Sequence, residues 1–213
     1  MKSIRLTYLI IVFSFAIIPA IGQQDISDSG FTNKAEAKNL MVNGSWEGKW
    51  IYYRDSLNST TADTSAPFYV LGIYKEGKPI GIKRGFYKNG KIEGKMPYRN
   101  GEENGKATVY YEDGKLMGEE PYTDGKINGI AKYYYENGKL KGEFPFANDT
   151  LIGLEKLYYE NGIVREECPF TNNQANGLRK WYYESGKLKR ETLYSNGVAG
   201  ETKNYDETGK EIK

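Results

Sequence analysis

Tyrosine is the residue of this chain whose number and spacing could serve a specific chemistry, and that chemistry is contact rather than catalysis. The 213 residues include 19 tyrosines, one cysteine and no histidine. Histidine is the commonest general base and metal ligand, so its absence argues against hydrolases and metalloenzymes. Aromatic side chains offer large contact areas at low conformational cost. We therefore predict a protein that is not an enzyme, with no catalytic residues, no metal and no cofactor.

The tyrosines belong to a sequence motif that repeats every 24 residues. A glycine, a tyrosine six residues later and a glycine three residues after that recur at Gly81/Tyr87/Gly90, Gly105/Tyr111/Gly114, Gly129/Tyr135/Gly138, Gly153/Tyr159/Gly162 and Gly177/Tyr183/Gly186. A fixed period of this length indicates a repeat architecture, in which stability comes from stacked neighbours. Function in such proteins usually lies on the long surface that the array creates.

Each repeat is predicted to be a β-hairpin. Two strand-like segments flank Asn137-Gly138, a dipeptide that suits a two-residue type I′ turn because both of its central residues take positive φ. That turn would place Tyr135 opposite Leu140 and Lys132 opposite Glu143. A second, longer turn would then pass the chain to the next hairpin.

Aromatic residues at successive strand positions place side chains on both faces of the predicted sheet. One column, nearest the hairpin turn, holds Tyr87, Tyr111, Tyr135, Tyr159 and Tyr183, and we assign it to cohesion between repeats. The next column holds Phe86, Tyr110, Tyr134, Tyr158, Tyr182 and Tyr205. The fold class that follows is all-β: an elongated, single-layer antiparallel sheet of tandem 24-residue hairpins, exposed on both faces.

The chain divides into segments of different composition. Residues 1–22 carry a positive start, an apolar stretch and small residues before Gln23, the pattern of a secretory signal peptide cleaved near Gly22-Gln23. An uncleaved anchor is the alternative, and in either case we expect an extracytoplasmic location, periplasmic or secreted. Residues 23–45 are polar and unpatterned, and are predicted to form a flexible lead-in. The array follows as an irregular first repeat at 46–80, regular repeats at 81–199 and a cap at 200–213.

The repeat motif resembles the repeat of a known protein family. Tyr-Tyr-Glu-Asn-Gly-Lys-Leu-Lys-Gly-Glu, followed by an aromatic residue and Gly-x-x-x-Gly, is similar to the bacterial variant of the MORN repeat, over roughly residues 48–210. Ile163, Asp149 and Asn173 depart from its pattern. The resemblance implies an extended hairpin array that contacts proteins or membranes, with no catalytic residues. Bacterial relatives are often described as antitoxins, which leaves antitoxin-like protein binding as an alternative.

Two sets of positions are the candidate partner-binding residues. The first set is the strand position that varies between repeats, and we select Tyr133, Leu157 and Trp181 from it. The second set is the aromatic column Tyr110, Tyr134, Tyr158 and Tyr182. For both sets the competing interpretation is packing. The row Lys132, Lys156 and Lys180 could face anionic lipid, but Glu143, Glu167 and Glu191 opposite it favour solvated cross-strand pairs.

The predicted function is an exported, non-enzymatic scaffold that makes protein–protein contacts at the cell envelope and could also self-associate. A balance of 30 basic to 28 acidic residues gives no basis for binding nucleic acid. The main alternative is a surface that binds glycan or lipid headgroups, because residues 180–186 also resemble the aromatic hairpins of choline- and wall-binding repeats.

Overall fold

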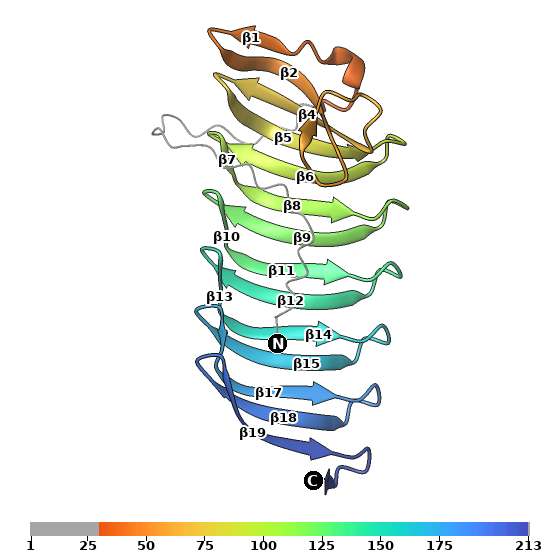
Figure 1. The fold of residues 1–213 in the computed structure, drawn as a ribbon, viewed down its shortest axis with the longest axis vertical. Coiled ribbons are helices and arrows are strands. Elements are labelled where there is room, and N and C mark those ends of the chain that lie inside the picture. Colours follow the sequence, from red (N-terminus) through yellow and green to blue (C-terminus); the bar gives the residue numbers. More distant parts are fainter. Residues whose placement is uncertain (1–29, 213) are drawn as a thin grey trace. The chain divides into compact units, whose positions relative to one another are not determined.

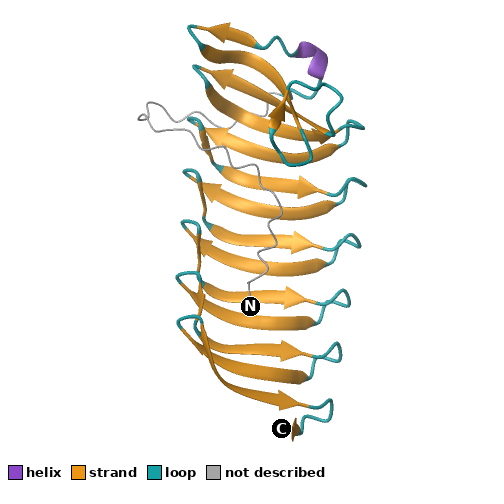
Figure 2. Ribbon diagram, in the orientation of Figure 1, coloured by secondary structure: helices purple, strands orange, loops and turns teal. Residues whose placement is uncertain are grey.

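The computed structural model describes residues 30–212, so the predicted signal peptide lies outside the described residues. The described residues form two compact units, one up to residue 101 and the other from residue 102 onward. Both units consist of antiparallel strands joined by tight turns, and the only helix in the described part is the single 3₁₀ turn η1 (Lys34–Glu36) (Figure 2). The predicted fold class, all-β with tandem antiparallel hairpins, is confirmed.

The first unit is a twisted sheet with a small aromatic core. Its strands are β1 (Leu40–Val42), β2 (Ser45–Arg54), β3 (Thr60–Thr61), β4 (Phe68–Lys75), β5 (Lys78–Tyr87) and β6 (Ile92–Arg99) (Figure 1). Strand β2 pairs with β1, β3 and β4, and β4 continues to β5 and β6. Phe31, Tyr69, Leu71 and Phe86 pack together as its core, and the rings of Tyr69 and Phe86 stack at 4.9 Å.

The described part of the predicted lead-in, residues 30–45, differs from the expected flexible segment. The Phe31 side chain is 2% exposed and belongs to the core. Farther along, Leu40 pairs with Glu47, so β1 adds a strand to the sheet. Phe31 packs on the face of β4 that carries Tyr69 and Leu71. A single aromatic residue in a polar stretch forms no periodic pattern, so the sequence did not predict this packing.

The second unit is a regular stack of hairpins in one layer (Figure 1). Each repeat contributes two long strands and, at its second turn, a two-residue strand. The strands are β7 (Glu102–Glu103), β8 (Gly105–Tyr110), β9 (Leu116–Thr123), β10 (Lys126–Ile127), β11 (Gly129–Tyr134), β12 (Leu140–Ala147), β13 (Thr150–Leu151), β14 (Gly153–Tyr158), β15 (Val164–Thr171), β16 (Gln174–Ala175), β17 (Gly177–Tyr182), β18 (Leu188–Ser195), β19 (Val198–Tyr205) and β20 (Glu211–Ile212). Pairing runs without interruption from β8 to β20.

The first turn of each repeat is not the predicted two-residue type I′ turn. The Gly138 N–H donates to the Tyr135 carbonyl at 2.8 Å, and the Tyr135 N–H donates to the Lys139 carbonyl at 2.9 Å. Only Gly138 has positive φ, at 82°. This is a three-residue loop, a type I turn closed by a left-handed glycine. Asn137 was predicted to take positive φ in this turn. It stabilises the turn through its side chain instead, because its Oδ1 accepts a hydrogen bond from the Lys139 N–H at 2.9 Å.

The predicted register is therefore right in the strand and wrong beside the turn. Lys132 lies opposite Glu143, as predicted, whereas Leu140 lies opposite Tyr134 rather than Tyr135. The longer loop shifts the pairing by one residue, and a β-bulge at Lys141 shifts it back. The same pair of shifts occurs in the neighbouring repeats, so each repeat carries one bulged residue near its first turn.

The type I′ geometry occurs instead at the second turn. Asn148 and Asp149 have φ values of 48° and 64°, between the paired residues Ala147 and Thr150. The Asp149 N–H donates to the Ile127 carbonyl of the preceding repeat at 3.0 Å, and the Asp149 carboxylate accepts from the Ile127 N–H at 2.8 Å. Asn173 makes the same two contacts one repeat later. The departures from glycine at these two positions thus add a bond between repeats.

Candidate binding surfaces

The tyrosine column nearest the first turn joins successive hairpins. The hydroxyl of Tyr135 donates to the backbone carbonyl of Tyr158, in the next repeat, at 2.6 Å. Equivalent bonds run from Tyr111 to Tyr134, from Tyr159 to Tyr182 and from Tyr183 to Tyr205, at 2.7, 2.7 and 2.9 Å. Each hydroxyl supplies a donor to a carbonyl near the end of a strand, so this column holds the stack together, as predicted.

The second candidate column lies on the opposite face, and its hydroxyl groups are occupied. Tyr134, Tyr158 and Tyr182 donate to carboxylates of the preceding hairpin at 3.2, 2.9 and 3.1 Å. Partial burial and the adjacent carboxylates raise the pKa of Tyr158 and Tyr182 to about 12. Tyr110 occupies the corresponding position at the end of β8. These tyrosines are half-buried and can contribute ring edges to a contact, while their hydroxyls serve the sheet.

The carboxylates that receive these bonds alternate with lysines along the same face. Glu143 lies opposite both Lys132 and Lys156, with a Lys132 Nζ–Glu143 Oε1 distance of 3.5 Å. Lys156 lies 3.9 Å from Glu167 in the next pair. The row is thus a ladder of alternating charge, as predicted, and neighbouring charges offset one another. Such a row gives little net attraction for an anionic membrane surface.

An apolar strip runs beside the charge ladder on the same face. We define it as Ile130, Leu154, Leu178 and Leu193, whose side chains are 52%, 42%, 38% and 54% exposed. Within the hairpins, Ile130 pairs with Pro145, Leu154 with Pro169, and Leu178 with Leu193. Exposed apolar side chains in a continuous row, rather than scattered singly, are typical of an interaction surface. The strip was not among the predicted binding residues.

The opposite face carries the other predicted set, and two of its three members each lie over a glycine of a neighbouring strand. A β-carbon at Gly118 would lie 2.7 Å from Tyr133 Cδ1, so the ring of Tyr133 covers that glycine. The Tyr133 hydroxyl donates to the buried Glu120 carboxylate, which is 4% exposed. Leu157 covers Gly142 in the same way, 3.0 Å from the position of a β-carbon there. Both side chains are half-buried and pack against the sheet.

Trp181 has different surroundings because neither strand beside it has a glycine opposite the indole. Its neighbours in the adjacent strands are Glu166 and Arg190, at the positions that hold Gly118 and Gly142 around Tyr133. The Arg190 guanidinium lies 3.8 Å from the indole centroid, and the Arg179 guanidinium lies 4.8 Å from it.

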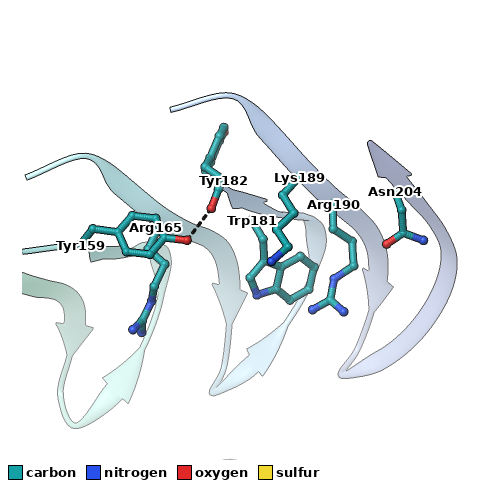
Figure 3. Close-up of a pocket in the computed structure, with 7 residues that line it drawn as sticks. All are labelled: Tyr159, Arg165, Trp181, Tyr182, Lys189, Arg190 and Asn204. Carbon is teal, nitrogen blue, oxygen red and sulfur yellow. Dashed lines mark hydrogen bonds between the residues drawn. The ribbon is translucent and has the colours of Figure 1, made fainter. Parts of the chain in front are cut away.

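A shallow hollow of about 280 Å³, which we call the basic hollow, opens beside Trp181 (Figure 3). It is lined by Tyr159, Arg165, Trp181, Tyr182, Lys189, Arg190 and Asn204.

The seven predicted binding residues therefore do not form one site. Tyr133, Leu157 and Trp181 lie on one face, and the Tyr110 column lies on the other, because neighbouring residues of a strand point to opposite faces. Of the predicted residues, Trp181 and Tyr182 line the hollow, and Tyr182 does so from the opposite side of the strand (Figure 3).

A polar cluster next to Trp181 was also missed. Arg179 Nε donates to Glu166 Oε1 at 2.6 Å, and both groups lie close to Glu155 and Cys168. Burial and the proximity of Glu166 raise the pKa of Glu155 to about 7. Burial raises the pKa of the Cys168 thiol to about 11, and its side chain is 1% exposed, which is unfavourable for a nucleophile. Among residues 30–212 no group of acidic, cysteine or histidine side chains could hold a metal ion.

Comparison with known proteins gives one informative match. No curated protein matches the chain significantly. A family model described as the MORN repeat variant matches five tandem segments, residues 79–100, 103–124, 127–148, 151–172 and 175–196. These segments make up just over half of the chain, and each spans one hairpin and its second turn. The chain therefore belongs to the MORN repeat variant family.

Proposed function

We propose that this protein is an exported, non-enzymatic scaffold that binds a partner protein at the cell envelope through the apolar strip. Repeats of this family are generally associated with binding to proteins or membranes. The proposed export rests on the signal-like sequence of residues 1–22, and the proposed binding rests on the surface of the second unit.

The exposed apolar strip is the observation that carries the proposal. Its four side chains are held in register by the strand pairing and by the tyrosine bonds between hairpins. A rigid row of this kind needs little ordering when a partner binds, and reduced ordering favours affinity. The row is bordered by Lys132, Lys156 and their glutamate neighbours, which are equal in charge and opposite in sign. The best complement is a protein surface with aliphatic side chains and mixed charges.

Lipid, glycan and enzyme functions receive less support from the described residues. Anionic lipid requires a net positive surface, and the ladder beside the strip is balanced. Stacking of a sugar or a choline group requires an open aromatic face, and both guanidinium groups at Trp181 compete for that ring. No helix in residues 30–212 is long and apolar enough to cross a membrane. In the polar cluster, Glu166 is hydrogen-bonded to Arg179, and Glu155 lies close to both groups.

A capture experiment tests the proposal. The protein from Gln23 onward is immobilised, and envelope extract is passed over it and over the triple variant Ile130→Ser, Leu154→Ser, Leu178→Ser. A control variant, Met41→Ser with Leu57→Ser, removes exposed apolar side chains from the first unit, where they are 50% and 84% exposed. Far-UV circular dichroism checks that all three proteins are folded.

We expect one specific protein to be retained by the wild type and the control variant and lost by the strip variant, and to bind again when purified. Equal retention by the strip variant would remove the strip as the binding surface. Enrichment of lipid or wall glycan without a protein would favour the surface-binding alternative. A mature N-terminus other than Gln23, with the protein found only in the cytoplasm, would contradict export and revive the antitoxin-like alternative.

A further inference from the structure

The basic hollow is a second site with its own chemistry, on the face opposite the apolar strip. Its indole comes from Trp181, whereas Lys180 and Tyr182 on either side of it in β17 point to the ladder face. Figure 3 shows the head groups of Arg165, Lys189 and Arg190 on the same side as the indole, while the ring of Tyr182 points away. The hollow therefore presents a basic and aromatic lining to one side of the sheet.

The hollow exists because the capping repeat lacks a large side chain. Across the hairpins, Arg190 pairs with Asn204, just as Glu166 pairs with Trp181 and Gly142 with Leu157. The row that contains leucine and tryptophan thus ends in a small amide. With no ring to cover it, the outer side of Arg190 stays open, and about 280 Å³ of space remains.

Three cations line the hollow without a matching anion. Arg165 and Lys189 are the bulged residues of their hairpins, which aims both of them toward the Trp181 side. In the described part of the chain, no carboxylate lies within ion-pairing distance of Arg165, Lys189 or Arg190. Arg179 differs, because Glu166 already holds it at 2.6 Å. The site is consequently one of uncompensated positive charge next to an aromatic ring.

We infer that the basic hollow binds the carboxylate of a glutamate or aspartate side chain in an acidic segment of a protein. A planar guanidinium matches a carboxylate in two parallel hydrogen bonds, and two arginines lie on the hollow. The rings of Trp181 and Tyr159 also line the hollow, next to these cations. A volume of this size holds one or two side chains rather than a larger ligand.

The inference goes beyond the proposed function, because it concerns another face and another ligand chemistry. The substitutions in the strip variant leave the residues of the hollow unchanged, and the substitutions in the hollow leave the strip unchanged. The two proposals can therefore fail separately. A bare phosphate would leave the aromatic lining uncovered, and a lipid headgroup would need a flat basic surface, so both are treated as outcomes of the test.

The test follows the indole N–H resonance of Trp181 in ¹⁵N spectra of the full mature protein, assigned with Trp181→Phe. The probe is an acetylated, amidated hexaglutamate peptide, and hexaglutamine is its neutral match. Inorganic phosphate and vesicles containing phosphatidylglycerol are titrated in parallel. The variants are Arg190→Gln and Arg165→Gln, and Lys126→Gln is the control because this exposed lysine lies in another repeat, outside the hollow.

We expect hexaglutamate to shift the Trp181 resonance, hexaglutamine to leave it in place, and each arginine variant to weaken binding about tenfold, the loss expected for one charge-assisted hydrogen bond. Arg165→Gln keeps the Arg190–Trp181 contact, so it separates loss of the ligand from loss of the stack. Binding that survives both arginine variants, or equals that of Lys126→Gln, would overturn the inference. A response to phosphate or vesicles without one to hexaglutamate would replace it with a phosphate or headgroup site.

Discussion

Glu155 is expected to lower the stability of the protein at neutral pH, and replacing it should show this directly. Its side chain lies opposite Cys168 in the β14–β15 hairpin. The two preceding repeats carry Ala107 and Ala131 at the same position, opposite Glu120 and Phe144. Burial, followed by the repulsion of Glu166, raises the pKa of Glu155 from 4.5 to about 7, and Arg179 only partly opposes this.

The raised pKa fixes the sign of the pH dependence. Between pH 4.5 and 7 the folded state binds a proton at Glu155 that the unfolded state releases, so stability falls as pH rises. The contribution is fully present below pH 4.5 and lost by about pH 7. At about 1.4 kcal/mol per pKa unit, the shift corresponds to roughly 3 kcal/mol. The carboxylate keeps some contact with water, so we expect a loss of about 1–3 kcal/mol.

Urea unfolding of the wild type and Glu155→Gln, followed by far-UV circular dichroism from pH 4 to pH 8, measures this loss. The variant should match the wild type at pH 4 and be more stable by about 1–3 kcal/mol at pH 8. Glu136→Gln, at an exposed turn position, removes the same charge and should not change the pH profile. Parallel profiles for the wild type and Glu155→Gln, or a variant that is less stable at pH 8, would refute the reasoning.

Three further changes test the bonds between and within repeats. Tyr159→Phe removes the 2.7 Å donation to the next hairpin and should cost about 1 kcal/mol in urea unfolding; an unchanged midpoint would contradict its role in cohesion. Gly118→Ala places a β-carbon 2.7 Å from Tyr133 and should cost about 1–3 kcal/mol, and less in a Tyr133→Leu background. Asn173→Ala loses the bond from Leu151 and keeps a φ of 63°, so it should cost about 1–2 kcal/mol, whereas Asn173→Gly should cost less.

The hairpins and their central pairs could be predicted because the period of the sequence is the period of the structure. The turn was misassigned because Asn-Gly fits both a type I′ loop and a type I turn closed by glycine. Other repeats held the deciding signal, since Ser185 and Thr208 occupy the position of Asn137. Thr208 is β-branched and avoids positive φ, which favours the three-residue loop. Asn148-Asp149, in contrast, consists of two residues that tolerate positive φ.

The binding surfaces were harder to predict because the sequence of one strand does not show which of its side chains are covered by residues of the neighbouring strands. Tyr133 and Trp181 occupy the same repeat position, yet one covers a glycine and the other lies beside two guanidinium groups. The apolar strip had a readable signal, an aliphatic residue directly after the first glycine in four of the five repeats, as at Ile130. The hollow depends on Asn204 and on β-bulges that no local sequence pattern predicts.

The bonds that join the hairpins leave the sheet faces open to variation, and this explains where function can reside. Tyr159, Asn173 and the strand backbone supply contacts between repeats that do not depend on the residue at the position of Glu155. The face can therefore accept residues that cost stability. Glu155 is one such residue, a half-buried carboxylate where earlier repeats have alanine. Local departures of this kind, made without a structural gain, are the expected mark of a functional surface, and here they surround Trp181.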